Sequence, residues 1–366
     1  MNRLNNSDAQ KRKESNGKDD IEEALKKKKI KIIPKKEHSN KKKKTKNKVK
    51  VKVKVKKTHP ILRLIWNIFL VLFVLIVLTG ILLYHKTIEN GGGIQGFLCT
   101  IFGQSVDDLK DLKPITFLLL GISNDIDKEL SDTIIVCNYD SLNDSVTLVS
   151  IPRDTFIGKN EANAKGSDKI NSLYSKDLQN TLKSVNKITG LNIKNYVVVK
   201  NSALIDIVNS LGGVWFDVPI DMNYDDPTQD LHIHLKKGYQ KLNGKEAEGL
   251  LRFRHNNDMT SYPAEYGDND FGRMKTQRNF IETTIKQSLE IQNLLKIGFV
   301  YNSVMKNLDT NITKETIFSY IPKVASLNTQ NINSLQIPGE SKKINNLWFF
   351  MPYEKQTLKL IKENIK

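Results

Sequence analysis

The stretch VTLVSIPRDT, residues 146–155, sets a continuous apolar run directly before Pro152 and the charged pair Arg153 and Asp154. A run of this kind predicts a strand that is buried on both faces of a sheet. Proline cannot donate the next ladder hydrogen bond, so the strand should end there. The sequence therefore predicts a buried strand whose end presents a guanidinium beside a carboxylate.

Further runs of both kinds lie on either side of this stretch. Strand-like apolar runs occupy 115–121, 133–139 and 195–200, and helical patterns occupy 171–188, 201–213 and 272–296. Strands interspersed with helices indicate an α/β fold, with a mixed central sheet that helices flank on both faces. We expect one folded domain over residues 113–366.

Charge separates the first part of the chain from the rest. The 366 residues include 57 Lys and Arg against 40 Asp and Glu. Residues 1–63 hold 24 basic and 7 acidic residues, and the remainder holds 33 of each, so the whole excess lies in that segment. With little to bury, residues 1–63 are predicted to form a disordered basic tail. Three roles stay open for it: a solvated topology signal, attraction to anionic lipids, or contact with nucleic-acid phosphates without sequence readout.

The tail is followed by an uncharged segment, residues 64–84. Its 21 residues match the ~20 that a helix needs to span a bilayer core. A cleaved signal peptide is the alternative, but its apolar region would be only ~7–15 residues long and nearer the N-terminus. The positive-inside rule then places the N-terminus in the cytoplasm and residues 85–366 outside the cell membrane. Residues 85–112 contain ENGGGIQG and are expected to form a flexible stalk.

Several familiar catalytic patterns are absent from the sequence, including G-x-S-x-G, H-E-x-x-H and the G-x-x-x-x-G-K-[ST] loop. His232 and His234, in LHIHL, would share one face of a strand and could ligate zinc. Without a further ligand nearby in the sequence, a structural role is favoured for them. Cys99 and Cys137 do not make a disulfide framework, and Cys137 lies in an apolar run that should bury it.

Charged side chains gather at the ends of the predicted elements: Asp132, Arg153, Asp154, Lys169, Arg252 and Arg254. In LLRFRH, Arg252 and Arg254 would point to one side of an extended segment, because the side-chain period of a strand is two. Two guanidiniums on one side repel unless an anion joins them, and arginine suits bidentate contact with phosphate. Nearby carboxylates then favour a divalent cation such as Mg²⁺. The alternative is ion pairing that only stabilises loops, between Arg153 and Asp154 and between the other arginines and carboxylates of 255–270.

The same residues stand within a longer series of motifs. In order, these are FLLLG, SDTIIV, VSIPRDT, KINSLY, LGGVWFDVP, LHIHLKKGYQKLNGKEAEGLLRFRH and DNDFGRMKTQ, over residues 115 to about 280. In these motifs the chain resembles the LytR-CpsA-Psr family of cell-wall ligases. The resemblance implies an α/β domain with an apolar groove for a lipid tail. It also implies transfer of an anionic glycopolymer, of teichoic-acid or capsule type, from a polyprenyl-pyrophosphate carrier to peptidoglycan.

Site residues follow from the resemblance, position by position. Asp132 would bind Mg²⁺, with Mn²⁺ as the alternative ion. The residues implied for the pyrophosphate are Arg153, Arg252, Arg254, Gln277, Lys169 and Arg273. Asp154 and Asp132 are the candidates for the base that takes the proton of the attacking sugar hydroxyl. Arg153 and the metal would neutralise charge, which is the main requirement of phosphoryl transfer.

The chain departs from the family pattern at four positions. Ser123 stands where a second aspartate ligand is usual, and Asp125 is expected to take that place. Leu130 replaces an arginine before the SD pair, and Thr276 and Arg278 replace residues of the usual double Arg-Gln-Gln ending.

Two alternatives to a ligase therefore stay open. One is a pyrophosphatase on lipid-linked substrates, with water as the acceptor. The other is a non-catalytic scaffold or regulator that binds polyprenyl lipid. A specific nucleic-acid partner is not expected, because the part after residue 63 is formally neutral.

Overall fold

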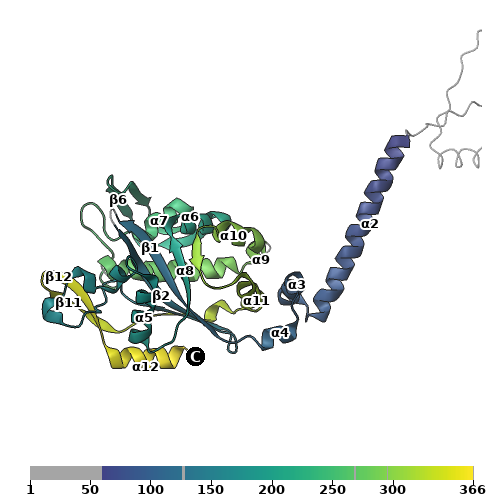
Figure 1. Ribbon diagram of the computed structural model, residues 1–366. Coiled ribbons are helices and arrows are strands. Elements are labelled where there is room, and N and C mark those ends of the chain that lie inside the picture. Colours follow the sequence, from purple (N-terminus) through teal and green to yellow (C-terminus); the bar gives the residue numbers. More distant parts are fainter. Residues whose placement is uncertain (1–59, 126–127, 268, 295, 366) are drawn as a thin grey trace, which may run out of the picture. The chain divides into compact units, whose positions relative to one another are not determined.

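The computed structural model describes residues 60–125, 128–267, 269–294 and 296–365 (Figure 1). It divides into two compact units, Met1–Thr79 and Gly80–Lys366. The predicted basic tail therefore lies outside the described residues, apart from its last four positions.

Helix α2, Pro60–Glu89, is the one helix of the described residues that is long and apolar enough to cross a membrane. None of its residues is buried. The helix exceeds the predicted 64–84 at both ends, so residues 60–63 and 85–89 are helical rather than parts of a tail and a stalk. Proline suits its first position, where no N–H is needed, and glycines with positive φ follow its end.

The flexible stalk predicted for residues 85–112 is wrong. Beyond α2, this segment forms helices α3, Gly93–Phe102, and α4, Val106–Lys110. Leu98 of α3 is 3% exposed and packs in one cluster with Leu294 and Ile321. Cys99 is fully buried. The apolar face of α3 thus belongs to the core, and the folded domain begins there rather than at residue 113.

The central sheet has six strands in the order β10-β3-β2-β1-β4-β9. Their bounds are β1 Ile115–Asp125, β2 Lys128–Asp140, β3 Ser145–Ser150, β4 Asn195–Lys200, β9 Leu308–Thr310 and β10 Ile332–Gln336. The pairs β1–β4 and β10–β3 are parallel, and the other neighbours are antiparallel. This arrangement confirms the predicted mixed sheet.

Both faces of the sheet are covered, which confirms the α/β class. On one face Leu118 and Leu120 of β1 pack against α5, Leu178–Thr189, and α12, Glu354–Asn364. On the other face the alternate residues of β1 face α8, Asn269–Ser288. The period of two along a strand therefore divides one apolar run between two cores.

A second apolar cluster is built by two hairpin-like sheets, β5–β8 and β6–β7, together with two helices. The bounds are β5 Val214–Val218, β6 Met222–Asp226, β7 Leu231–Leu235, β8 Gly238–Leu242, α6 Asn201–Ser210 and α7 Gly244–Arg252. The remaining elements are α9 Ile291–Leu294, α10 Ile297–Val304, α11 Lys314–Val324, β11 Gly339–Ile344 and β12 Leu347–Pro352, with short 3-10 turns at 161–163, 166–168, 170–173 and 329–331. In Figure 1, α6 and α7 lie beside the end of β1 that leads to the candidate site.

Two predicted helices are shorter than the sequence pattern indicated. The pattern over 171–188 is a 3-10 turn followed by α5, because the side chain of Asp177 accepts from the N–H of Gln179 and starts the helix there. The pattern over 272–296 is divided between α8 and α9.

Candidate active site

A β-bulge directs Asp132 out of the sheet. In the β1–β2 ladder Gly121 pairs with Thr133, whereas Ile122 pairs with Ser131, so Asp132 is the extra residue. A Cβ on Gly121 would lie 2.9 Å from the Cβ of Thr133, which explains the glycine of FLLLG. Bulges re-aim side chains next to active sites, and Asp132 lines the main cavity described below.

Arg153 follows the end of β3 and reaches Asp132. Its Nη1 donates to Oδ1 of Asp132 across 2.8 Å, and its side chain is 17% exposed. Burial by itself lowers the pKa of Arg153, but the carboxylates of Asp270, Asp132 and Asp154 outweigh it and hold that pKa above the usual value. The guanidinium is therefore a fixed positive charge at the end of the sheet.

Asp270, in the first turn of α8, gathers three arginines. Its Oδ1 lies 2.6 Å from Nη2 of Arg273, 3.5 Å from Nε of Arg254 and 3.7 Å from Nε of Arg153. These four residues are called the arginine cluster below. Sequence reasoning missed Asp270, although its position three residues before Arg273 in DNDFGRMKTQ is a spacing that brings side chains together on a helix.

The arginine cluster contains unused hydrogen-bonding capacity. Among the described residues, no aligned partner is found for the buried Nε of Arg153, the Nε and Nη2 of Arg273, or the Oδ1 of Asp270. The contact of 2.6 Å between Asp270 and Arg273 is thus an ion pair without hydrogen-bond alignment. Arg273 is 4% exposed, and burial lowers its pKa, against the nearby charge of Asp270. Buried donors without partners are costly, so the cluster is suited to accept an anion.

The sequence predicted that Arg252 and Arg254 lie in one extended segment, and this prediction is wrong. Arg252 is the last residue of α7, because the capping box of Asn243 and Glu246 starts a helix that continues to this point. Its Nη1 lies 3.3 Å from Oε1 of Glu248, and its Nη2 donates to Oε1 of Gln229 across 2.7 Å. The two arginines therefore have separate carboxylate partners, Glu248 and Asp270.

Asp154 and Lys169 form a pair of their own. Nζ of Lys169 lies 2.8 Å from Oδ1 of Asp154, and Nε of Arg153 lies 4.0 Å from the other carboxylate oxygen. Neither residue belongs to the lining of the main cavity. Arg153 does not line that cavity either, so the pair extends the charged group around Arg153 rather than the cavity wall.

The structure describes the side chain of Gln277 but not that of Asp125. Gln277 is 6% exposed, lines the main cavity and donates from Nε2 to the carbonyl of Leu251 across 2.9 Å. The departures have partners as well, since Thr276 contacts the hydroxyl of Tyr266 and Arg278 donates to Gln336. Asp125 ends β1, but its side chain lies outside the described part of the structure, as does that of Ser123.

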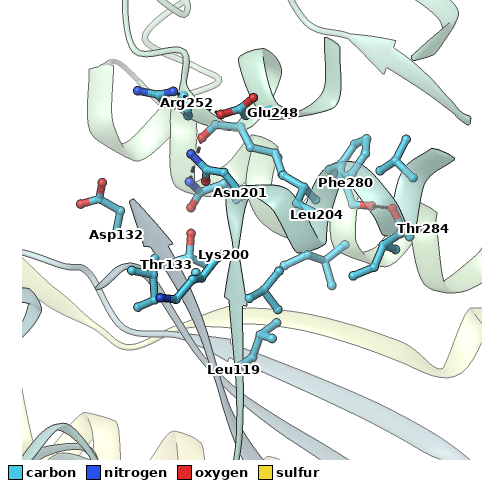
Figure 2. Close-up of a pocket in the computed structure, with 18 of the residues that line it drawn as sticks. Leu119, Asp132, Thr133, Lys200, Asn201, Leu204, Glu248, Arg252, Phe280 and Thr284 are labelled. Carbon is cyan, nitrogen blue, oxygen red and sulfur yellow. Dashed lines mark hydrogen bonds and ion pairs between the residues drawn. The ribbon is translucent and has the colours of Figure 1, made fainter. Parts of the chain in front are cut away.

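The main cavity, of about 240 Å³, reaches the arginine cluster at Arg273, and side chains of α8 from Arg273 to Ile285 form part of its wall. Polar residues gather at one end, as Figure 2 shows for Asp132, Glu248 and Arg252, whereas Leu204, Phe280 and Thr284 line the other end. The cavity is therefore amphiphilic along its length.

A second cavity, of about 440 Å³, continues the apolar end. It shares Thr284 and Ile285 with the main cavity, and Tyr320 and Val324 of α11 contribute to its far side. Together the two cavities extend along one face of the central sheet, from Asp132 to residues of α11, and most of their lining side chains are apolar.

The sequence of the chain is similar to those of known proteins. The model of the LytR_cpsA_psr family matches residues 92–366. The Bacillus cereus polyisoprenyl-teichoic acid–peptidoglycan teichoic acid transferase TagU is 31% identical over 244 residues, which cover 65% of this chain and 73% of that protein. The Bacillus subtilis relative with the same description, TagV, is 29% identical over 254 residues, which cover 68% of this chain and 62% of that protein.

Structural similarity leads to the same family. The crystal structure of B. subtilis TagV superposes with a TM-score of 0.58 at 28% sequence identity, over 69% of this chain and 96% of that chain. The family match covers the domain from just before α3 to the last residue. The chain therefore belongs to the LytR-CpsA-Psr family.

Proposed function

We propose that this chain transfers an anionic glycopolymer from a polyprenyl-pyrophosphate carrier to peptidoglycan, through a phosphodiester. Its relatives are named as transferases of polyisoprenyl-linked teichoic acid to peptidoglycan, which supports a transferase acting on a cell-wall polymer. A polymer of teichoic-acid type is the substrate we favour over one of capsule type, because both of these relatives carry that description.

The observation that carries the proposal is that Arg273 belongs both to the arginine cluster and to the lining of the main cavity. Arg153, Arg254 and Arg273 converge on one carboxylate, and Arg153 and Arg273 keep buried donors available for an anion. The cavities beyond are lined mainly by apolar side chains at their far end. A ligand with a pyrophosphate head and a polyprenyl tail satisfies both halves of this site.

Charge neutralisation is the main work of the site in this reaction. The acceptor hydroxyl oxygen attacks the phosphorus that carries the glycopolymer, a new P–O bond forms, and the P–O bond to polyprenyl phosphate breaks. The arginines stabilise the negative charge that develops on the phosphate oxygens. Gln277 and Arg252, on the cavity lining, orient the same group.

The residues present also fit a Mg²⁺ ion, with Mn²⁺ as the alternative. Mg²⁺ is usually held by one or two carboxylates together with substrate phosphates, and Asp132 is a carboxylate on the cavity lining. When bound there, the ion would add positive charge next to the leaving phosphate. The proton of the acceptor hydroxyl would go to Asp132 or Asp154. Of these two carboxylates only Asp132 lines the cavity. Activity retained in Asp154→Asn would therefore leave Asp132 as the base.

The place of the reaction follows from α2. We propose that α2 anchors the chain in the cell membrane as a single span, with the N-terminus in the cytoplasm and the domain outside. The Lys-rich residues before α2 would then lie against anionic lipid head groups.

The test uses the full-length chain in detergent micelles, with a polyprenyl-pyrophosphate oligosaccharide. Reactions are run with and without peptidoglycan fragments, and with Mg²⁺ or chelator. Joined polymer and released polyprenyl phosphate support the transferase. Polyprenyl phosphate released equally without the acceptor would support a pyrophosphatase instead, and binding without turnover under every condition would support a scaffold.

A further inference from the structure

The β6–β7 hairpin presents three metal-ligand side chains on one face. His232 and His234 are two residues apart on β7, so both side chains lie on its exposed face. Asp225 of β6 is the direct ladder partner of His232. The sequence offered the two histidines without a third ligand, and the pairing of the strands supplies it. Among the residues that the structure describes, this is the one set of three such side chains whose ligand atoms lie within 4.8 Å of one another.

The distances within this set suit coordination. Oδ1 of Asp225 lies 2.5 Å from Nδ1 of His232 and 3.2 Å from Nε2 of His234. Ligand atoms ~2.0–2.2 Å from a tetrahedral zinc ion are roughly 3.3 Å apart, so an ion requires only small side-chain shifts. The backbone already holds both strands in register.

A neighbouring residue orients one of the ligands. Oδ1 of Asn223, the ladder partner of His234, lies 2.7 Å from Nδ1 of that ring. An N–H on Nδ1 would satisfy this contact and would leave the lone pair of Nε2 available to a metal ion. Partners of this kind fix the tautomer of ligating histidines in metal sites generally.

We infer that Asp225, His232 and His234 bind a divalent transition metal of the Zn²⁺ type. The side chains are 43%, 55% and 56% exposed, so an ion can enter from solvent and keep an open position for water or an outside ligand. Two imidazoles and one carboxylate favour such an ion over Mg²⁺, which prefers oxygen ligands. The site is separate from Asp132, and it does not depend on the proposed function.

The hairpin is also connected to the candidate active site by a hydrogen bond between its turn and Arg252. Gln229, in the turn between β6 and β7, bonds to Asp226 and accepts from Arg252. Metal binding would therefore order the segment that holds one arginine of the main cavity.

The test is a Zn²⁺ titration of the full-length, chelator-treated chain in detergent micelles, by calorimetry and by hydrogen exchange of residues 222–235. We expect one equivalent of Zn²⁺ to bind and to slow exchange in both strands. His232→Asn, His234→Asn and Asp225→Asn should each abolish this saturable binding. Asn223→Ala should weaken it by the roughly 10–100-fold typical of lost supporting contacts.

The matched control is His85→Asn, which removes an exposed histidine from α2 and should leave the titration unchanged. Because the three ligand side chains are exposed, each variant should have the same melting temperature as the metal-free wild-type chain. Absence of saturable binding in the wild type, or equal binding in His234→Asn, would overturn the site. None of these readouts requires turnover, so the result is independent of the transfer assay.

Discussion

Nη1 of Arg153 donates to Oδ1 of Asp132 across 2.8 Å, and this bond joins the residue after Pro152 to the bulge of β2. Arg153→Ala should lower kcat/KM of transfer by about 10²–10³-fold, as the loss of a donor to developing charge does elsewhere. Asp132→Asn should lower it as well, and the double variant should lose less than the two single losses combined, because the residues act as one unit. Arg153→Lys is the control, since it keeps the charge without the planar fork. Full activity in Arg153→Ala would contradict the assigned role.

Asp270→Asn removes the shared carboxylate of the arginine cluster. The three guanidiniums then repel one another, so the free energy of unfolding should fall by about 2–3 kcal/mol, below the range for a fully buried pair because Asp270 is partly exposed. Inorganic pyrophosphate should raise the melting temperature of this variant more than that of the wild type, since it replaces the lost charge. Thermal unfolding with and without pyrophosphate measures both effects.

The exposed pair of Asp107 and Lys110 gives the control for this experiment. Asp107→Asn should change neither the melting temperature nor its response to pyrophosphate, because that carboxylate is 86% exposed. An Asp270→Asn chain as stable as the wild type would show that Asp270 does not balance the arginines.

Ile285→Trp should narrow the junction between the two cavities. Because Ile285 lines both of them, a bulky ring there would exclude a long polyprenyl tail and leave room for a short one. Turnover of a long-chain carrier should fall at least about tenfold, or ~1.4 kcal/mol, relative to a short-chain carrier. Lys286→Trp, on the exposed side of α8, is the matched control and should keep the wild-type ratio. Equal loss with both carriers would place the tail elsewhere.

Gly121→Ala should disturb the bulge that directs Asp132. The new methyl would meet the Cβ of Thr133 at 2.9 Å, an overpacking that costs about 1–3 kcal/mol. Activity should fall further than stability predicts, because Asp132 moves with the strand. Gly298→Ala meets no atom within 4 Å and should be neutral or slightly stabilising. Denaturant unfolding and the transfer assay, run on both variants, distinguish these outcomes.

Cys137 should resist alkylation in the folded chain. Burial raises the pKa of its thiol from 9.0 to about 12, and the thiolate is the reactive form. Iodoacetamide at pH 8 should therefore modify it only after denaturation, as should hold for the buried Cys99. Since the folded pKa is the higher one, the thiol's contribution to stability is complete below about pH 9 and is lost as the pH rises toward 12. Rapid labelling of the native chain would contradict this burial.

The central sheet was predictable because its inner strands are continuous apolar runs with clear ends. β3 ends at Ser150, two residues before the end predicted at Pro152, and β4 coincides with the run at 195–200. The stalk was not predictable in the same way, because the glycines before α3 resemble a linker. Only the contacts of Leu98 with distant helices show that the segment belongs to the core.

The sequence indicated that Asp132 and the arginines stand near the ends of apolar elements, whereas their partners were not predictable. Asp270 acquires its role from Arg153, which is 117 positions away in the sequence, and from Arg254, and these residues meet only in the folded chain. The helical state of Arg252 was missed because LLRFRH reads as an alternating strand when the cap at Asn243 is ignored. The bulge at Asp132 depends on pairing between two strands, which no single stretch contains.

Helix α8 places Arg273 at the arginine cluster and Ile285 at the junction of the two cavities. At ~1.5 Å per residue, these positions lie roughly 18 Å apart along the helix axis. In the proposed function, this distance sets the length of substrate that can contact both positions. A small anion can reach only the first turns of α8 and a short hydrocarbon only the last, so a molecule must be both amphiphilic and long to gain from the whole length.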